Sequence, residues 1–216
     1  MKEVLPFIVL AHTKLGESSL VLHTLSEEYG RRGFITTVSR SSGMALFLPL
    51  NLLEGEISPN KKSDLMRVGS LCCRHPLDGI RSDVRKNSMT LFMSEVLFRT
   101  VRDGASEPGL AGWCERSLLT LDALGSDFSN FHLVWLLELC GALGFSPSTE
   151  SLAPFAGGSL AALGSLLQAP LSEALLLPLS GSRRSAAASC ILDYLSFHTG
   201  SKIEARSLKV LSELYK

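Results

Sequence analysis

Short apolar runs separated by turn residues fill the first third of the chain. The runs are rich in β-branched and aromatic residues, and clusters of Gly, Pro, Ser and charged residues lie between them, which is typical of β-strands. A turn is expected at 27–33, where Gly30 and Gly33 permit a tight backbone path, and Gly55 suggests a β-bulge. The predicted strands span residues 6–11, 19–25, 34–39, 50–58 and 65–73.

Five short strands in this length of chain favour a small closed barrel. Five is the strand number of the OB-fold, whose sheet face and loops bind oligonucleotides. An SH3-like barrel fits the same strand number almost as well. Periodicity alone does not separate the two barrels.

The pattern changes to a helical period after Gly79. The segment 128–143 is apolar nearly all round, which predicts a buried central helix, and Gly144 followed by Pro147 marks its end. Helices are predicted at 80–102, 110–124, 128–143, 160–168, 172–177, 183–199 and 205–214.

The remaining stretch, 148–158, contains Pro154 and two consecutive glycines and is expected to be a loop. The whole pattern predicts an α+β chain. A five-stranded OB-fold is expected in residues 1–78 and an α-helical domain in residues 79–216.

The charges are distributed unevenly, although the formal net charge is zero. Residues 1–102 carry a balance of +4, residues 103–182 a balance of −7, and residues 183–216 a balance of +3. Basic segments on both sides of an acidic middle favour a polyanionic partner at the two ends. Chance segregation of charge in a neutral protein is the alternative.

No sequence feature indicates catalysis, a cofactor or a metal. The five histidines and five cysteines form no zinc, nucleophile or phosphate-binding motif, and the odd cysteine number argues against a disulfide framework. His132 lies in the most apolar segment and is interpreted as a core residue. We therefore expect a non-enzymatic protein without cofactor.

The apolar runs are too short and too often interrupted to span a membrane, and no signal peptide begins the chain. Cytoplasmic localisation is expected.

Basic side chains recur around the predicted turns of the barrel, with Tyr29 and Phe34 beside an arginine pair. Single-strand binding needs positive charge for the backbone and flat side chains for the bases. The alternative is that the arginines are solvated turn residues and that Phe34 belongs to the core. The candidate anion-binding residues are Lys14, Arg31, Arg32, Arg40, Lys61 and Lys62.

The order of these features resembles the RecO family of bacterial recombination mediators. In the barrel, the similar segments are Ile8-Val9-Leu10, Leu15–Ser19, Tyr29-Gly30-Arg31, Val38–Ser42, Leu48-Pro49-Leu50 and Leu53-Glu54. In the helical part, they are Leu137–Pro147 with its Gly-Phe-x-Pro end, Leu192–Leu195, His198-Thr199-Gly200 and Ser207–Leu211.

This resemblance implies an N-terminal OB-fold and a C-terminal helical domain. It also implies a function in DNA repair, namely that the chain binds and anneals single-stranded DNA, displaces single-strand-binding protein and loads RecA together with RecR. By similarity, the DNA contacts fall on Lys14, Arg31, Arg32 and Arg40. The protein would associate with the nucleoid when bound to DNA.

Zinc-binding members of the family carry four cysteines after the Gly-Phe-x-Pro element. Residues 148–158 contain none, so we expect that the zinc module is lost and that no metal is bound. The acidic, apolar tail of single-strand-binding protein would need an apolar pocket with a basic rim. Candidate rim residues are Arg183, Arg184, Arg206 and Lys209.

The competing interpretation is a protein-interaction module whose barrel binds a peptide or subunit instead of DNA.

Overall fold

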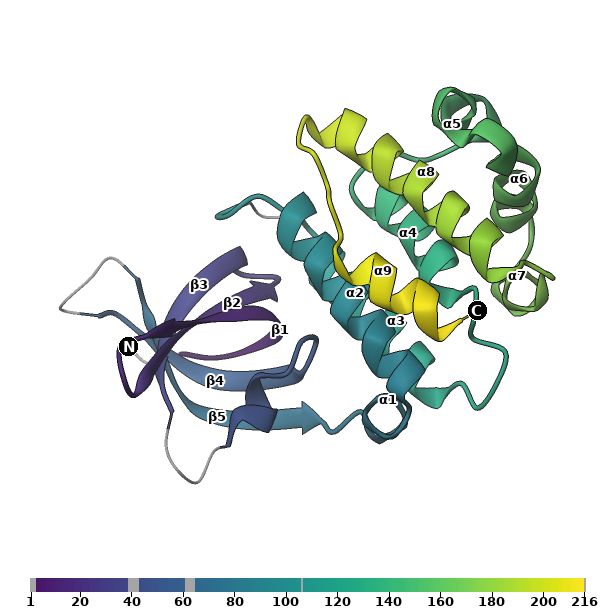
Figure 1. The fold of residues 1–216 in the computed structure, drawn as a ribbon. Coiled ribbons are helices and arrows are strands. Elements are labelled where there is room, and N and C mark those ends of the chain that lie inside the picture. The colour runs from purple at the N-terminus through teal and green to yellow at the C-terminus, as the bar shows by residue number, and fades with distance from the viewer. Residues whose placement is uncertain (1–2, 39–42, 61–64, 106, 216) are drawn as a thin grey trace. The chain divides into compact units, whose positions relative to one another are not determined.

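The computed structural model describes residues 3–38, 43–60, 65–105 and 107–215 (Figure 1). By its internal contacts the chain divides into a barrel unit, residues 1–78 with 101–118, and a helical unit, residues 79–100 with 119–216. Residues 101–118 thus belong with the barrel unit. The division into independent domains at 1–78 and 79–216 stays a prediction.

The described strands form one closed barrel in the order β1-β2-β3-β5-β4. All paired neighbours are antiparallel except β3 and β5, which are parallel. This connectivity is that of an OB-fold and confirms the predicted fold class. The strands are β1 (Glu3–Leu15), β2 (Ser19–Ser26), β3 (Gly30–Thr37), β4 (Leu52–Ser58) and β5 (Arg67–His75).

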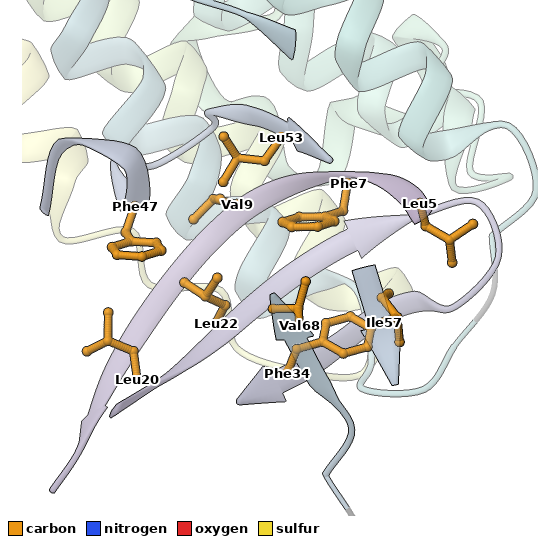
Figure 2. Packing of buried hydrophobic residues seen from close by; sticks show 10 residues of the cluster. All are labelled: Leu5, Phe7, Val9, Leu20, Leu22, Phe34, Phe47, Leu53, Ile57 and Val68. Carbon is orange, nitrogen blue, oxygen red and sulfur yellow. The ribbon is translucent and has the colours of Figure 1, made fainter. Parts of the chain in front are cut away.

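The interior of the barrel is filled by apolar side chains that alternate along the strands (Figure 2). Phe34 is fully buried, so its interpretation as a core residue is confirmed. The short 3-10 helix η1 (Met44–Phe47), between β3 and β4, adds Phe47 to this cluster. The cluster comprises Leu5, Phe7, Val9, Leu20, Leu22, Phe34, Phe47, Leu53, Ile57 and Val68.

A bulge interrupts the pairing of β4 with β5 next to Gly55, as the sequence predicts. A Cβ atom at this position would lie 2.7 Å from Cγ2 of Val68 and 3.0 Å from the carbonyl oxygen of Gly69. Gly55 therefore allows the two strands to approach closely.

The predicted turn at 27–33 is wrong in extent. Gly30 is left-handed with φ of 58° and already pairs with Ser26, so β3 begins there. Only residues 27–29 connect the strands. This places Arg31 and Arg32 inside a strand, where successive side chains point to opposite faces.

The first predicted helix, 80–102, is divided at Asp83. The Asp83 carboxylate accepts a hydrogen bond from the backbone N–H of Arg85 at 2.8 Å and so begins a new helix. The remaining helices lie close to their predicted positions. The helices are α1 (Asp78–Ser82), α2 (Val84–Thr100), α3 (Leu110–Ala123), α4 (Phe131–Ala142), α5 (Thr149–Ala156), α6 (Leu160–Gln168), α7 (Leu171–Leu176), α8 (Gly181–Thr199) and α9 (Ser207–Leu214), with a 3-10 turn η2 (Gly157–Ser159).

The predicted loop at 148–158 is instead largely the helix α5. Ser148 and Ser151 form a reciprocal capping box, in which each hydroxyl accepts a hydrogen bond from the backbone N–H of the other.

The central helix of the helical unit is α4, as predicted. The residues of α4 are buried all round except Glu138 and the last two, Gly141 and Ala142. Helices α8, α6 and α7 pack against it. His132 is 3% exposed, which confirms it as a core residue. In the described ranges, each helix is too short or too polar to cross a lipid bilayer.

Candidate nucleic-acid interface

Three strand connections leave the barrel at one end, which we call the loop end. Ser19 pairs with Thr37, and the N–H of Val38 donates to the carbonyl of Ser18 at 2.9 Å, so the β1–β2 connection lies beside the chain that leaves β3. The connection between β4 and β5 starts and finishes there too, because Arg67 pairs with both Ser58 and Ile35.

Among the described residues, one basic residue that the sequence singles out, Lys14, lies at the loop end. Lys14 is exposed beside the β1–β2 connection. Arg40, Lys61 and Lys62 lie outside the described residues. Val38, before the segment with Arg40, lies at the loop end, and the chain after that segment continues into η1. The segment with Lys61 and Lys62 connects β4 to β5, whose Ser58 and Arg67 pair at the loop end.

Arg67 is a basic residue of the loop end that sequence reasoning missed. It is exposed at the start of β5, and its Nη2 donates to Oγ1 of Thr37 on β3 at 3.3 Å. Its only sequence signal is that a positive charge opens a predicted strand directly after the loop with Lys61 and Lys62. Its neighbour Thr37 follows only from the parallel pairing of β3 with β5.

The arginine pair does not form a joint anion site, since its two members point to opposite faces of β3. Arg31 is half-buried and is tied to its own chain. Its Nη1 donates to the carbonyl oxygen of Val101 at 2.7 Å, and its backbone pairs with Gly104 and Ala105. Burial lowers the pKa of Arg31, and the nearby Asp103 counteracts this effect.

Arg32 is the exposed member of the pair. Its guanidinium carbon lies 5.6 Å from the ring centre of Tyr29, in a cation–π arrangement. Its cross-strand partner is Thr24, whereas that of Lys14 is Leu20. The two basic residues are therefore about 13 Å apart along β2, and Arg32 lies toward the end opposite the loop end.

His23 lies on β2 between these positions, and its Nε2 is 3.1 Å from Oγ1 of Thr13. Burial and the charge of Arg31 lower the pKa of His23, while Asp103 raises it. A lowered pKa favours the neutral imidazole at pH 7, and His23 points to the face of β2 opposite to that of Leu20 and Thr24.

The candidate partner residues of the helical unit differ in their availability. Arg183, Arg206 and Lys209 are exposed. Arg184 is half-buried, and its guanidinium donates to the carbonyl oxygens of Leu179 and Tyr215. Arg184 therefore has a structural role.

Within the described ranges, no group of three or more His, Cys, Asp or Glu side chains could hold a metal ion. Cys72 and Cys73 are exposed on β5, whereas Cys114, Cys140 and Cys190 are buried. Burial raises the pKa of Cys140 to about 12, so this thiol stays protonated.

Comparisons with known proteins agree with the barrel and helical architecture. The family model "Recombination protein O N terminal" matches residues 1–74, and "Recombination protein O C terminal" matches residues 81–153. Together these matches cover more than half of the chain.

Three curated relatives carry the name DNA repair protein RecO. The protein of Phocaeicola vulgatus is 29% identical over 97% of this chain and 89% of its own length. That of Flavobacterium psychrophilum is 28% identical over 96% and 97%, and that of Bacteroides fragilis is 33% identical over 66% and 61%. The chain belongs to the RecO family of DNA repair proteins.

Proposed function

We propose that this protein is a recombination mediator that binds single-stranded DNA at the loop end of its barrel. It would anneal complementary strands, help to displace single-strand-binding protein, and load RecA together with RecR. No chemical step is required of it. This function would place it at the nucleoid, in the cytoplasm.

The observation that carries the proposal is the convergence of basic strand connections on one end of an OB-fold. Lys14 and Arg67 lie at this end, the segment containing Lys61 and Lys62 starts and finishes there, and the segment containing Arg40 starts there. Ligands of OB-folds bind on the β2–β3 face and its flanking loops. Arg32, toward the opposite end of β2, would be a further contact outside the loop end.

Annealing follows from the same charges. Two DNA strands repel each other through their phosphates, and a basic surface that neutralises some of these phosphates reduces the repulsion. Phosphate contacts leave the base edges free to pair. We infer that the barrel accelerates pairing by holding two strands close together.

For the tail of single-strand-binding protein, the helical unit offers exposed basic residues around exposed apolar ones. At the start of α9, Arg206, which precedes the helix, and Lys209 lie near Val210, which is 51% exposed. Arg183 is exposed in the first turn of α8. An acidic and apolar peptide would find both complementary charge and apolar surface there.

The test of DNA binding is a double variant, Lys14→Gln with Arg67→Gln. Each lost phosphate contact lowers the affinity for single strands about fivefold at 0.1 M salt, so a loss of roughly 10- to 30-fold is expected. Fluorescence anisotropy with a labelled oligonucleotide measures the affinity, and the annealing rate should fall in parallel.

The matched control is Arg183→Gln with Lys202→Gln, which removes one arginine and one lysine from exposed positions of the helical unit. Its affinity for DNA should remain that of the wild type. Equal losses in both variants would mean that only total charge matters. Unchanged binding in the barrel variant would favour the alternative, a barrel that binds a peptide or subunit.

A further inference from the structure

A small cavity lies in the helical unit between α8 and α9. Its volume is about 10 Å³, which accommodates a single particle of the size of a water molecule. His132 of α4 and Tyr215, after α9, are among the residues that line it. The lining residues are His132, Gly181, Arg184, Ser185, Leu208, Leu211, Ser212 and Tyr215.

Several polar atoms of these lining residues are buried without a hydrogen-bond partner among the described residues. They are Oη of Tyr215, Nε of Arg184 and Nδ1 of His132. Tyr215 is 8% exposed and His132 is 3% exposed. A buried donor without a partner typically costs about 1–3 kcal/mol, so a particle that satisfies two or three of them would bind favourably.

The described residues around the cavity leave an excess of positive charge. Arg184 donates to two carbonyl oxygens, which are neutral groups. Two further charged residues, Asp83 and Arg85, lie near Tyr215. These two form an ion pair at 3.1 Å and compensate each other.

The start of α8 adds to this excess. Gly181, the first residue of α8, lines the cavity. The first-turn amides of a helix carry a partial positive charge. Burial also lowers the pKa of Arg184, while Tyr215 raises it.

We propose that this cavity binds one small anion, of the size of chloride or of a single carboxylate oxygen. The anion would be held by Arg184, Tyr215 and the start of α8. It would connect α4, α8 and the C-terminal residues of the helical unit. This inference does not depend on DNA binding by the barrel.

Two measurements on the full-length chain test the anion site. Crystals grown or soaked in sodium bromide should show an anomalous peak in the cavity. Thermal unfolding should show a saturable increase in the midpoint temperature with chloride, compared with methanesulfonate at equal ionic strength, because methanesulfonate is too large to enter. A concentration ten times the Kd should raise the midpoint by about 3–5 °C.

The variants assign the effect to the cavity. Arg184→Gln removes the charge and should abolish the chloride-dependent increase. Tyr215→Phe, which removes one donor and keeps the ring, should weaken it several-fold and provides a readout even if Arg184→Gln does not fold. The control Arg183→Gln changes the exposed neighbour in the sequence and should respond to chloride like the wild type.

A second arm distinguishes the source of the anion. Formate that reproduces the stabilisation would show that the site also accepts a carboxylate, and a response to chloride and bromide alone would assign it to halides. No bromide peak together with equal stability in chloride and methanesulfonate would overturn the proposal in favour of a water molecule. An equal chloride response in Arg184→Gln, Tyr215→Phe and wild type would also overturn it.

Discussion

Replacement of Gly79 by alanine is expected to destabilise the helical unit by about 3 kcal/mol. A Cβ atom at Gly79 would lie 2.2 Å from the carbonyl oxygen of Asp122. This oxygen belongs to the backbone and also accepts a hydrogen bond from Nζ of Lys86 at 2.9 Å, while the Asp122 carboxylate accepts one from the N–H of Ile80 at 2.7 Å. The clash cannot be relieved by rotating a side chain.

The matched control is Gly141→Ala, in α4. A Cβ atom there would contact nothing within 4 Å, so alanine should stabilise the helix by up to about 1 kcal/mol. Urea unfolding, followed by circular dichroism, measures both variants. Equal stabilities of Gly79→Ala and Gly141→Ala would contradict the close approach of α1 to the end of α3.

Stability is expected to fall by about 2 kcal/mol between pH 7 and pH 5 because of His132 alone. Complete burial and the charge of Arg184 lower the pKa of His132 to about 3, although the Ser129 carbonyl raises it. In the unfolded chain the imidazole binds a proton near pH 6.5, while the folded form stays neutral. The stabilisation is therefore present above pH 6.5 and is progressively lost as the pH falls toward 3.

The measurement is the free energy of unfolding of the wild type and of His132→Asn at pH 7, 6 and 5. At pH 7, His132→Asn is expected to be less stable than the wild type. Between pH 7 and pH 5, its free energy of unfolding should fall by about 2 kcal/mol less than that of the wild type. Glu95 adds a further loss of stability only at lower pH. Burial opposes ionisation of this carboxylate, but hydrogen bonds from Ser207 and Arg99 give a net lowering of its pKa below 4.5. Parallel pH profiles for wild type and variant would show that His132 titrates normally.

The fold was largely predictable because local preferences and burial agree along most of the chain. The apolar helix α4 and the strand that contains Phe34 are examples. The choice between an OB-fold and an SH3-like barrel could not be predicted. It depends on the parallel pairing of Ile35 with Arg67, which are 32 residues apart in sequence. Helix α5 was missed because a serine, not a glutamate, completes its capping box.

The candidate site was predictable only as a set of basic residues. Sequence proximity suggested that Arg31 and Arg32 act together, but successive side chains of a strand point to opposite faces. Arg31 is also hydrogen-bonded to Val101, Gly104 and Ala105. Arg67 and Lys14 lie at the same end of the barrel only because β1, β2, β3 and β5 close into one sheet. Such long-range register has no local signal in a single sequence.

The salt dependence of single-strand binding tests the central claim most directly. Six candidate contacts, namely Lys14, Arg32, Arg40, Lys61, Lys62 and Arg67, predict a slope of log affinity against log salt of about −4. Replacing all of them except Arg32 by glutamine should reduce the slope to about −1 or abolish measurable binding. A variant that keeps both the affinity and the steep slope of the wild type would contradict a DNA-binding site at the loop end.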